Sequence, residues 1–123
     1  MTYVMLAIFG AAGTLARYGL QGLVQSRTGS GFPSGTLVVN LSGCVVMAAI
    51  ARYAFDHLWI PAHLRTAVLI GFFGAFTTYS SFSWEAVRML EDGDWAKAGL
   101  YVGGTLIGGF LATALGIYIG ARV

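Results

Sequence analysis

The most chemically distinctive part of the chain is the run from Gly71 to Ser83, which reads GFFGAFTTYSSFS. From Thr77 on, five of its seven residues are Ser or Thr. These residues are poor helix formers and two glycines precede them, so we expect a broken helix here. Unwound carbonyls are natural ligands for a small cation. The alternative is an unbroken helix whose hydroxyls bond to carbonyls one turn earlier.

Two aromatic residues within this run add a second kind of chemistry. Tyr79 and Phe82 are three positions apart, so they share one face if the helix resumes there. An aromatic ring has an electropositive edge. Ring edges beside hydroxyl donors suit a small anion that accepts hydrogen bonds strongly. The alternative is that both rings simply pack in a core.

The elements that must position these residues are apolar enough to be membrane helices. Hydrophobic residues make up 57% of the chain and charged residues 10%, whereas a soluble domain has about 25% charged residues. A membrane helix needs about 20 mostly apolar residues. We therefore predict an all-α integral membrane protein with one domain, residues 1–123, and a third span broken near mid-membrane. Its four spans are 4–24, 34–55, 65–90 and 98–119.

Composition also excludes several classes of function. The net charge of +2 is too small and too scattered for a nucleic-acid surface. The sequence contains no phosphate-binding loop, nucleophile–base pair or cluster of metal-binding side chains. We therefore do not expect an enzyme. The single cysteine, Cys44, lies in an apolar run and is interpreted as a small packing residue.

Three polar side chains inside the predicted spans lie at similar depth. At the helical rise of 1.5 Å per residue, Arg17, Asn40 and Glu85 are each about 8 to 10 Å from the same end of the bundle. Polar groups in hydrocarbon are costly and are functional candidates by default. One interpretation is a vestibule with a fixed positive charge, in which Asn40 offers its NH2 group to an anion. The alternative is an Arg17–Glu85 ion pair that only holds helices together.

The fourth predicted span carries two neighbouring stripes. Gly104, Gly108, Ala112 and Gly116 recur every four residues, and such small residues let another helix approach closely. Beside them run Tyr101, Thr105 and Thr113, which are either a polar track along a pore or hydrogen-bonding contacts between helices. Asp94 is placed to cap the start of this helix.

Positive charges give no preferred orientation in the membrane. Arg52, Arg65 and Arg122 fall toward one side, and Arg27, Arg88 and Lys97 fall toward the other. Because cytoplasmic loops are normally enriched in Lys and Arg, this balance is compatible with insertion both ways. Dual insertion would allow an antiparallel homodimer.

Taken together, these residues resemble a known family. The run from Gly35 to Asn40, the run from Gly71 to Ser83, and Arg17 are similar to motifs of the small fluoride channels of the Fluc (CrcB) family. The resemblance covers the whole chain. It implies an antiparallel, dual-topology homodimer with two pores in the inner cell membrane. Similar proteins let cytoplasmic fluoride leave passively down its gradient.

The resemblance also implies roles for individual residues. Asn40 matches the pore asparagine, and Tyr79 and Phe82 match two ring positions at the ion. Arg17 and Glu85 match vestibule positions. Gly74 and Thr77 match the backbone carbonyls that hold a structural Na⁺ at the dimer axis. The hydroxyl track corresponds to Ser80, Ser81, Tyr101, Thr105 and Thr113.

The chain departs from the family pattern at four positions. Tyr79 stands where Phe is usual, which keeps the ring edge but adds a phenol. Ala75 stands where a second glycine is common, Ser81 replaces a usual Thr, and Gly109 offers the track no side chain.

Two other functions remain as alternatives to a fluoride channel. A proton-coupled exporter of the small multidrug-resistance type needs a carboxylate in its first span, and this chain has none there. A non-transporting membrane assembly subunit would use mainly the glycine stripe.

Overall fold

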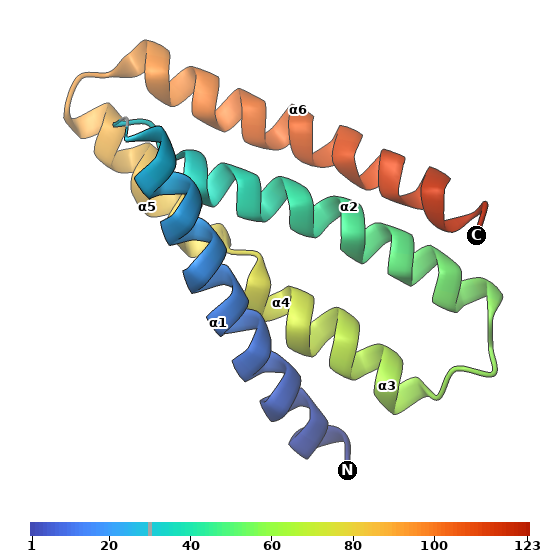
Figure 1. Cartoon of the computed structure of the whole chain (residues 1–123). Helices are drawn as coiled ribbons and strands as arrows, with labels where there is room; N and C mark the ends of the chain where they lie inside the picture. The colour runs from blue at the N-terminus through green and yellow to red at the C-terminus, as the bar shows by residue number, and fades with distance from the viewer. Residues whose placement is uncertain (30) are drawn as a thin grey trace.

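The computed structural model describes residues 1–29 and 31–123, and the described chain is helical with no strand. Three of its helices are long and apolar enough to cross a membrane. They are α1 (Thr2–Thr28), α2 (Ser34–Asp56) and α6 (Trp95–Gly120). Each covers the whole of the corresponding predicted span and ends beyond it. Both termini and the α2–α3 connection lie at one end of the molecule (Figure 1).

The segment predicted at 65–90 is built from several shorter helices. They are α3 (Ala62–Thr66), the π-helical η1 (Ala67–Phe72), α4 (Phe73–Phe76) and α5 (Tyr79–Glu91). Between α4 and α5, Thr77 and Thr78 have extended backbones, with φ/ψ of −83°/156° and −145°/118°. We call these two residues the linker. Gly71 and Gly74 both lie within helices, so the chain leaves the helix after the glycines rather than at them.

Threonine hydroxyls stabilise both helix ends at the linker. The Thr77 hydroxyl donates to the carbonyl of Phe73 at 2.9 Å, one turn back. The Thr78 hydroxyl accepts from the backbone N–H of Ser81 at 3.2 Å and so caps the start of α5. One hydroxyl therefore back-bonds into a helix, as the alternative interpretation of the run predicts, and the other begins a new helix.

Helices α2 and α6 run side by side along their length (Figure 1). A methyl group at Gly116 would overlap the carbonyl of Val45, and one at Gly120 would overlap the carbonyl of Ala49. Only glycine allows the two backbones this close. Two members of the predicted stripe lie at this contact: Gly116, and Gly108, whose methyl position is 3.1 Å from the Leu41 side chain. Gly104 does not take part, because no described atom lies within 4 Å of its methyl position, and the contact continues past the stripe to Gly120.

Helix α1 crosses η1 and α4, where a methyl group on Gly13 would overlap the backbone of Phe72. Two apolar clusters flank the linker. Val39, Phe73 and Phe76 form one between α2 and α4. The other lies between α5 and α6 and consists of Phe82, Ala86, Met89, Ala98 and Tyr101.

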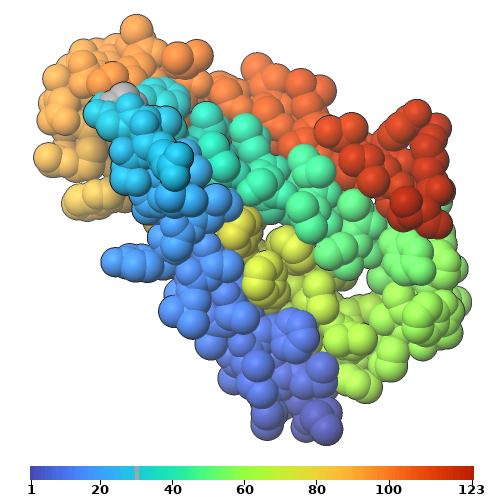
Figure 2. All heavy atoms as spheres, viewed as in Figure 1, coloured from blue at the N-terminus to red at the C-terminus, as the bar shows by residue number. Residues whose placement is uncertain are grey.

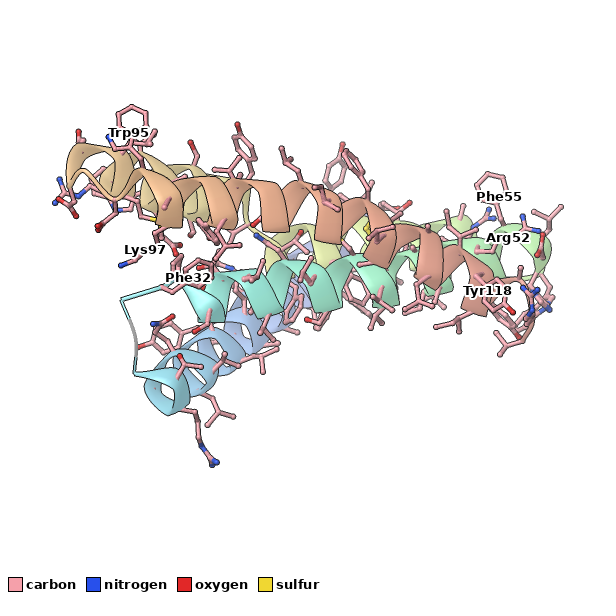
Figure 3. The ribbon with its side chains drawn as sticks, turned by 90° about the horizontal axis from the view of Figure 1, so that it is seen from above. Phe32, Arg52, Phe55, Trp95, Lys97 and Tyr118 are labelled. Atoms are coloured by element: carbon pink, nitrogen blue, oxygen red, sulfur yellow. The ribbon has the colours of Figure 1, made fainter. Side chains whose placement is uncertain are left out.

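The outer surface is rich in large apolar side chains, as a membrane protein requires. Helix α6 alone exposes Leu100, Ile107, Phe110 and Leu111 by 65% or more. Polar and aromatic residues gather at the ends: Trp95 and Lys97 lie at one end, and Arg52, Phe55 and Tyr118 at the other (Figure 3). Asp94 is the N-cap residue of α6, as predicted, but its side chain makes no capping hydrogen bond to a described residue and lies 3.8 Å from the Lys97 ammonium instead.

Candidate ion pathway

A hollow of about 850 Å³ opens at the end of the molecule where α1 stops and α2 begins. We call it the vestibule. Helix α1 forms one wall, and the N-terminal turn of α2 and helix α5 form the others. Figure 2 shows the end of α1 lying against the orange surface at this end of the molecule. Both predicted vestibule residues, Arg17 and Glu85, line it. Its other polar lining residues include Gln21, Gln25, Thr36, Arg88 and Lys97.

Arg17 and Glu85 do not form an ion pair within the described part of the chain. The Arg17 Nε donates instead to the carbonyl of Ala75 at 3.0 Å. That carbonyl belongs to the last turn of α4, where carbonyls have no partner within the helix. The interpretation of the pair as a simple helix tie is therefore wrong. Arg17 instead joins α1 to the edge of the linker, and it also lines the vestibule.

Glu85 lies in a hydrogen-bonded chain across three helices. Its Oε1 accepts from the Thr36 hydroxyl at 2.7 Å, and Thr36 Oγ1 accepts from Gln21 Nε2 at 3.2 Å. Thr36 is only 1% exposed. The chain of bonds therefore connects α1, α2 and α5 at the inner end of the vestibule.

Asn40 pairs with the linker on both sides of its amide. Its Nδ2 donates to the carbonyl of Thr78 at 2.9 Å, and its Oδ1 accepts from the N–H of Thr78 at 2.8 Å. The asparagine thus replaces the peptide partners that Thr78 loses where the helix stops. One of the two N–H donors of the Asn40 amide is used in this way, so the second N–H is left for another acceptor.

Tyr79 and Phe82 differ sharply in exposure. Their ring centroids are 6.1 Å apart, but Tyr79 is 79% exposed and Phe82 only 9%. Phe82 packs edge-on against Tyr101, with ring centroids 5.1 Å apart. The Phe82 ring therefore belongs to the interior of the chain, and the Tyr79 ring projects from it.

Two hydroxyls of the predicted track on α6 are buried in the described part of the chain without a well-formed hydrogen bond. Tyr101 is 0% exposed, and neither its OH nor the Thr105 Oγ1 makes a hydrogen bond of full geometry to a described residue. Thr36 and Glu85 nevertheless lie beside the Tyr101 hydroxyl. Buried polar atoms of folded proteins are almost always bonded, so two orphans one helical turn apart indicate a path for a hydrogen-bond acceptor.

The remaining track residues are distributed differently. Ser81 Oγ accepts from the Thr78 hydroxyl at 3.1 Å, and Ser80 Oγ is 3.4 Å from it. Both serines are thus tied to the linker, whereas Thr113 is half-buried on α6 farther toward the C-terminus. The described residues contain no group of three His, Cys, Asp or Glu side chains that could hold a metal ion.

The family model described as "CrcB-like protein, Camphor Resistance (CrcB)" matches residues 4–117. The chain belongs to the CrcB family. Its relatives include the fluoride-specific ion channel FluC of Nitratidesulfovibrio vulgaris, 41% identical over 98% of this chain and 97% of the relative. The channels of the same name from Geobacter metallireducens and Nitrosococcus oceani are 43% and 44% identical, over 95% and 93% of this chain and 94% and 91% of theirs.

Three partners in this CrcB site were missed by reasoning from the sequence. Thr36, Thr78 and Gln21 were not singled out, although each bonds to a predicted site residue or links one to another helix. A signal existed for Gln21: amides are costly in a membrane span, so a glutamine within the first span needs a partner. Thr36 and Thr78 carry no such signal, because a single hydroxyl is easily satisfied within its own helix.

Proposed function

We propose that this chain forms a fluoride-selective pore that lets fluoride leave the cell passively and so limits its toxicity. The observation that carries the proposal is the pair of buried hydroxyls of Tyr101 and Thr105, which make no hydrogen bond of full geometry in the described part of the chain. Fluoride is a compact anion that accepts hydrogen bonds strongly. Neither hydroxyl donates with full geometry to a described residue, although the Tyr101 hydroxyl lies beside the Glu85 carboxylate. The relatives named as fluoride-specific channels support the same ion.

The ion path begins at the vestibule and follows α6. Arg17 supplies positive charge, and the ion then passes the hydroxyls of Tyr101 and Thr105 toward Thr113. Asn40 contributes its remaining N–H bond, and Ser80 and Ser81 add hydroxyls from α5. The edges of the Tyr79 and Phe82 rings complete the lining.

The functional unit is an antiparallel homodimer inserted in both orientations. Several features support it: Tyr79 and Gly74 are exposed at the linker, and the positive charges are balanced between the two ends. A ring that projects by 79% into lipid would bring its phenol with it, whereas a second copy could take it up. Each copy would then contribute its Tyr79 ring to a pore shared with its partner.

The backbone carbonyls of Gly74 and Thr77 would hold a structural Na⁺ between the two copies. The chemistry of the linker fits such an ion, because the last carbonyls of α4 lack helical partners and Gly74 has open space around it. Arg17 already occupies the carbonyl of Ala75, which leaves the neighbouring carbonyls for a cation. The bound ion would supply positive charge that offsets the partial charges of these carbonyls.

Fluoride efflux from liposomes tests the proposal, read with a fluoride electrode beside a chloride control. We expect rapid efflux that requires valinomycin for charge balance and does not require a proton gradient. Chloride should not leave. Efflux that follows an imposed proton gradient would indicate a coupled exporter instead, and no flux from folded dimers would indicate a non-transporting subunit.

A further inference from the structure

Gln21 is the one link between α1 and the hydrogen-bonded pair Thr36–Glu85 that the described residues contain. It lies on the wall of the vestibule, half-buried, with its backbone against Gly35 at the start of α2. A methyl group at Gly35 would overlap the Gln21 carbonyl, so the two helices are held in backbone contact at this level. The packing of α1 against α2 therefore places the Gln21 side chain next to Thr36.

The hydrogen-bonded chain has a direction. The amide nitrogen of Gln21 can only donate, so the Thr36 oxygen accepts from it. A threonine hydroxyl has a single proton, and with one lone pair engaged by Gln21 that proton points at the Glu85 carboxylate, 2.7 Å away. The order of donation is Gln21 to Thr36 to Glu85.

This direction matters because Tyr101 lies beside the same carboxylate. Its buried hydroxyl has no partner of full geometry, while Thr36 and Glu85 are its polar neighbours. When the Thr36 hydroxyl donates a hydrogen bond to Glu85, part of the negative charge of the carboxylate is already stabilised. The carboxylate then attracts the Tyr101 hydroxyl less strongly. If the Thr36 hydroxyl were free to rotate, Tyr101 would be the nearest replacement donor for Glu85 and would no longer be free for an ion.

We propose that Gln21 is a positioning residue for ion conduction: its amide orients the Thr36 hydroxyl toward Glu85 and thereby keeps the Tyr101 hydroxyl available to fluoride. The inference rests on the pore assignment above. Gln21 does not need to touch the ion. Gln21 affects conduction only by setting the orientation of the Thr36 hydroxyl.

The test replaces Gln21 by Met, which is unbranched and similar in length but donates no hydrogen bond. Fluoride efflux from liposomes should fall about three- to tenfold, the range expected from one net hydrogen bond. Gln25→Met is the matched control. Gln25 is one turn away on the same wall and bonds to the N–H of Gly35 and the carbonyl of Phe32, so it also ties α1 to α2 but not through Thr36.

A double-mutant cycle separates positioning from packing. Thr36→Val removes the hydroxyl, and in that background Gln21→Met should cause no further loss of flux, since the hydroxyl it orients is gone. The proposal is overturned if Gln21→Met conducts like the wild type, or if it lowers flux equally with and without the Thr36 hydroxyl. It is also overturned if Gln21→Met and Gln25→Met lower flux and melting temperature in parallel.

A separate variant checks the pore assignment itself. Tyr101→Phe removes the proposed donor and should reduce flux whether or not Gln21 orients the Thr36 hydroxyl. If Tyr101→Phe conducts normally, the pore assignment fails and the role of Gln21 with it. If Tyr101→Phe is impaired and Gln21→Met is not, only the role of Gln21 fails.

Discussion

The α2–α6 pair and the segment from α3 to α5 satisfy their backbone hydrogen-bonding groups in opposite ways. Both are rich in apolar residues, but α2 and α6 are continuous helices in backbone contact through Gly116 and Gly120. The segment from α3 to α5 is interrupted at Thr77 and Thr78, and its freed backbone groups are taken up by Asn40 and Arg17. The continuous pair therefore supplies the structural frame, and the interrupted segment supplies the polar groups of the site. Substitutions in the two regions should therefore fail in different ways.

Gly116→Leu should have the largest effect, because it removes the frame. The new side chain would have to occupy space taken by the Val45 carbonyl, so α6 must move away from α2 along its C-terminal half. We expect loss of folded protein, measured by size-exclusion chromatography and thermal unfolding in detergent. Gly99→Ala is the control, since nothing lies within 4 Å of its methyl position and alanine favours helix. A well-folded Gly116→Leu protein would contradict the tight contact.

Asn40→Asp should leave the packing of α2 against α6 intact and lower fluoride conduction. The aspartate still accepts from the N–H of Thr78, but it can no longer donate to the Thr78 carbonyl and it adds a negative charge beside the anion path. We expect fluoride efflux from liposomes to fall about ten- to a hundredfold. The loss combines the missing hydrogen bond to the Thr78 carbonyl with repulsion between the aspartate and fluoride. Melting temperature should change much less than for Gly116→Leu. Normal fluoride flux would rule out the role proposed for Asn40.

Arg17→Gln tests the other attachment of the linker. It removes a cation from the vestibule and the bond to the Ala75 carbonyl together, so we expect about a tenfold loss of flux at low ionic strength. The loss should shrink as salt is raised, because salt screens the vestibule charge. Arg27→Gln, at the end of α1 and outside the vestibule lining, should have little effect. Equal losses for both arginines would mean that only net charge matters.

Thr78→Ala should have the smallest effect of the four. It removes the hydroxyl that caps α5 but keeps the backbone that Asn40 holds, and loss of such a cap costs about 1 kcal/mol. Thermal unfolding of Thr78→Ala beside Thr78→Ser, which retains the hydroxyl, measures the difference. A loss in Thr78→Ser as large as in Thr78→Ala would show that the hydroxyl is not the cause.

The contrast between frame and linker also explains what the sequence could predict. Hydropathy located α1, α2 and α6 because a membrane helix needs a long apolar run, and that run is visible residue by residue. It could not locate the register of the α2–α6 contact. Glycines recur through much of α6, and only packing against Val45 and Ala49 distinguishes Gly116 and Gly120 from Gly104.

The sequence was enough to predict which charged and amide residues form the candidate site, but not which hydrogen bonds they make. Arg17, Asn40 and Glu85 stand out because polar groups in a span are rare. Their partners do not, since Ala75 and Thr78 contribute backbone atoms that every residue has. An Arg17–Glu85 ion pair was therefore one of two interpretations left open by the sequence, whereas the structure gives each of these residues a different neutral partner.

The linker has an electrostatic consequence for the ions proposed around it. A helix carries about half a positive elementary charge at its N-terminus and half a negative one at its C-terminus. The helical stretch that ends at Phe76 and helix α5, which begins at Tyr79, bring these opposite poles within a few residues of each other. One interruption of the chain thus offers a favourable potential to a cation on one side and to an anion on the other, without a single acidic or basic side chain in the linker itself.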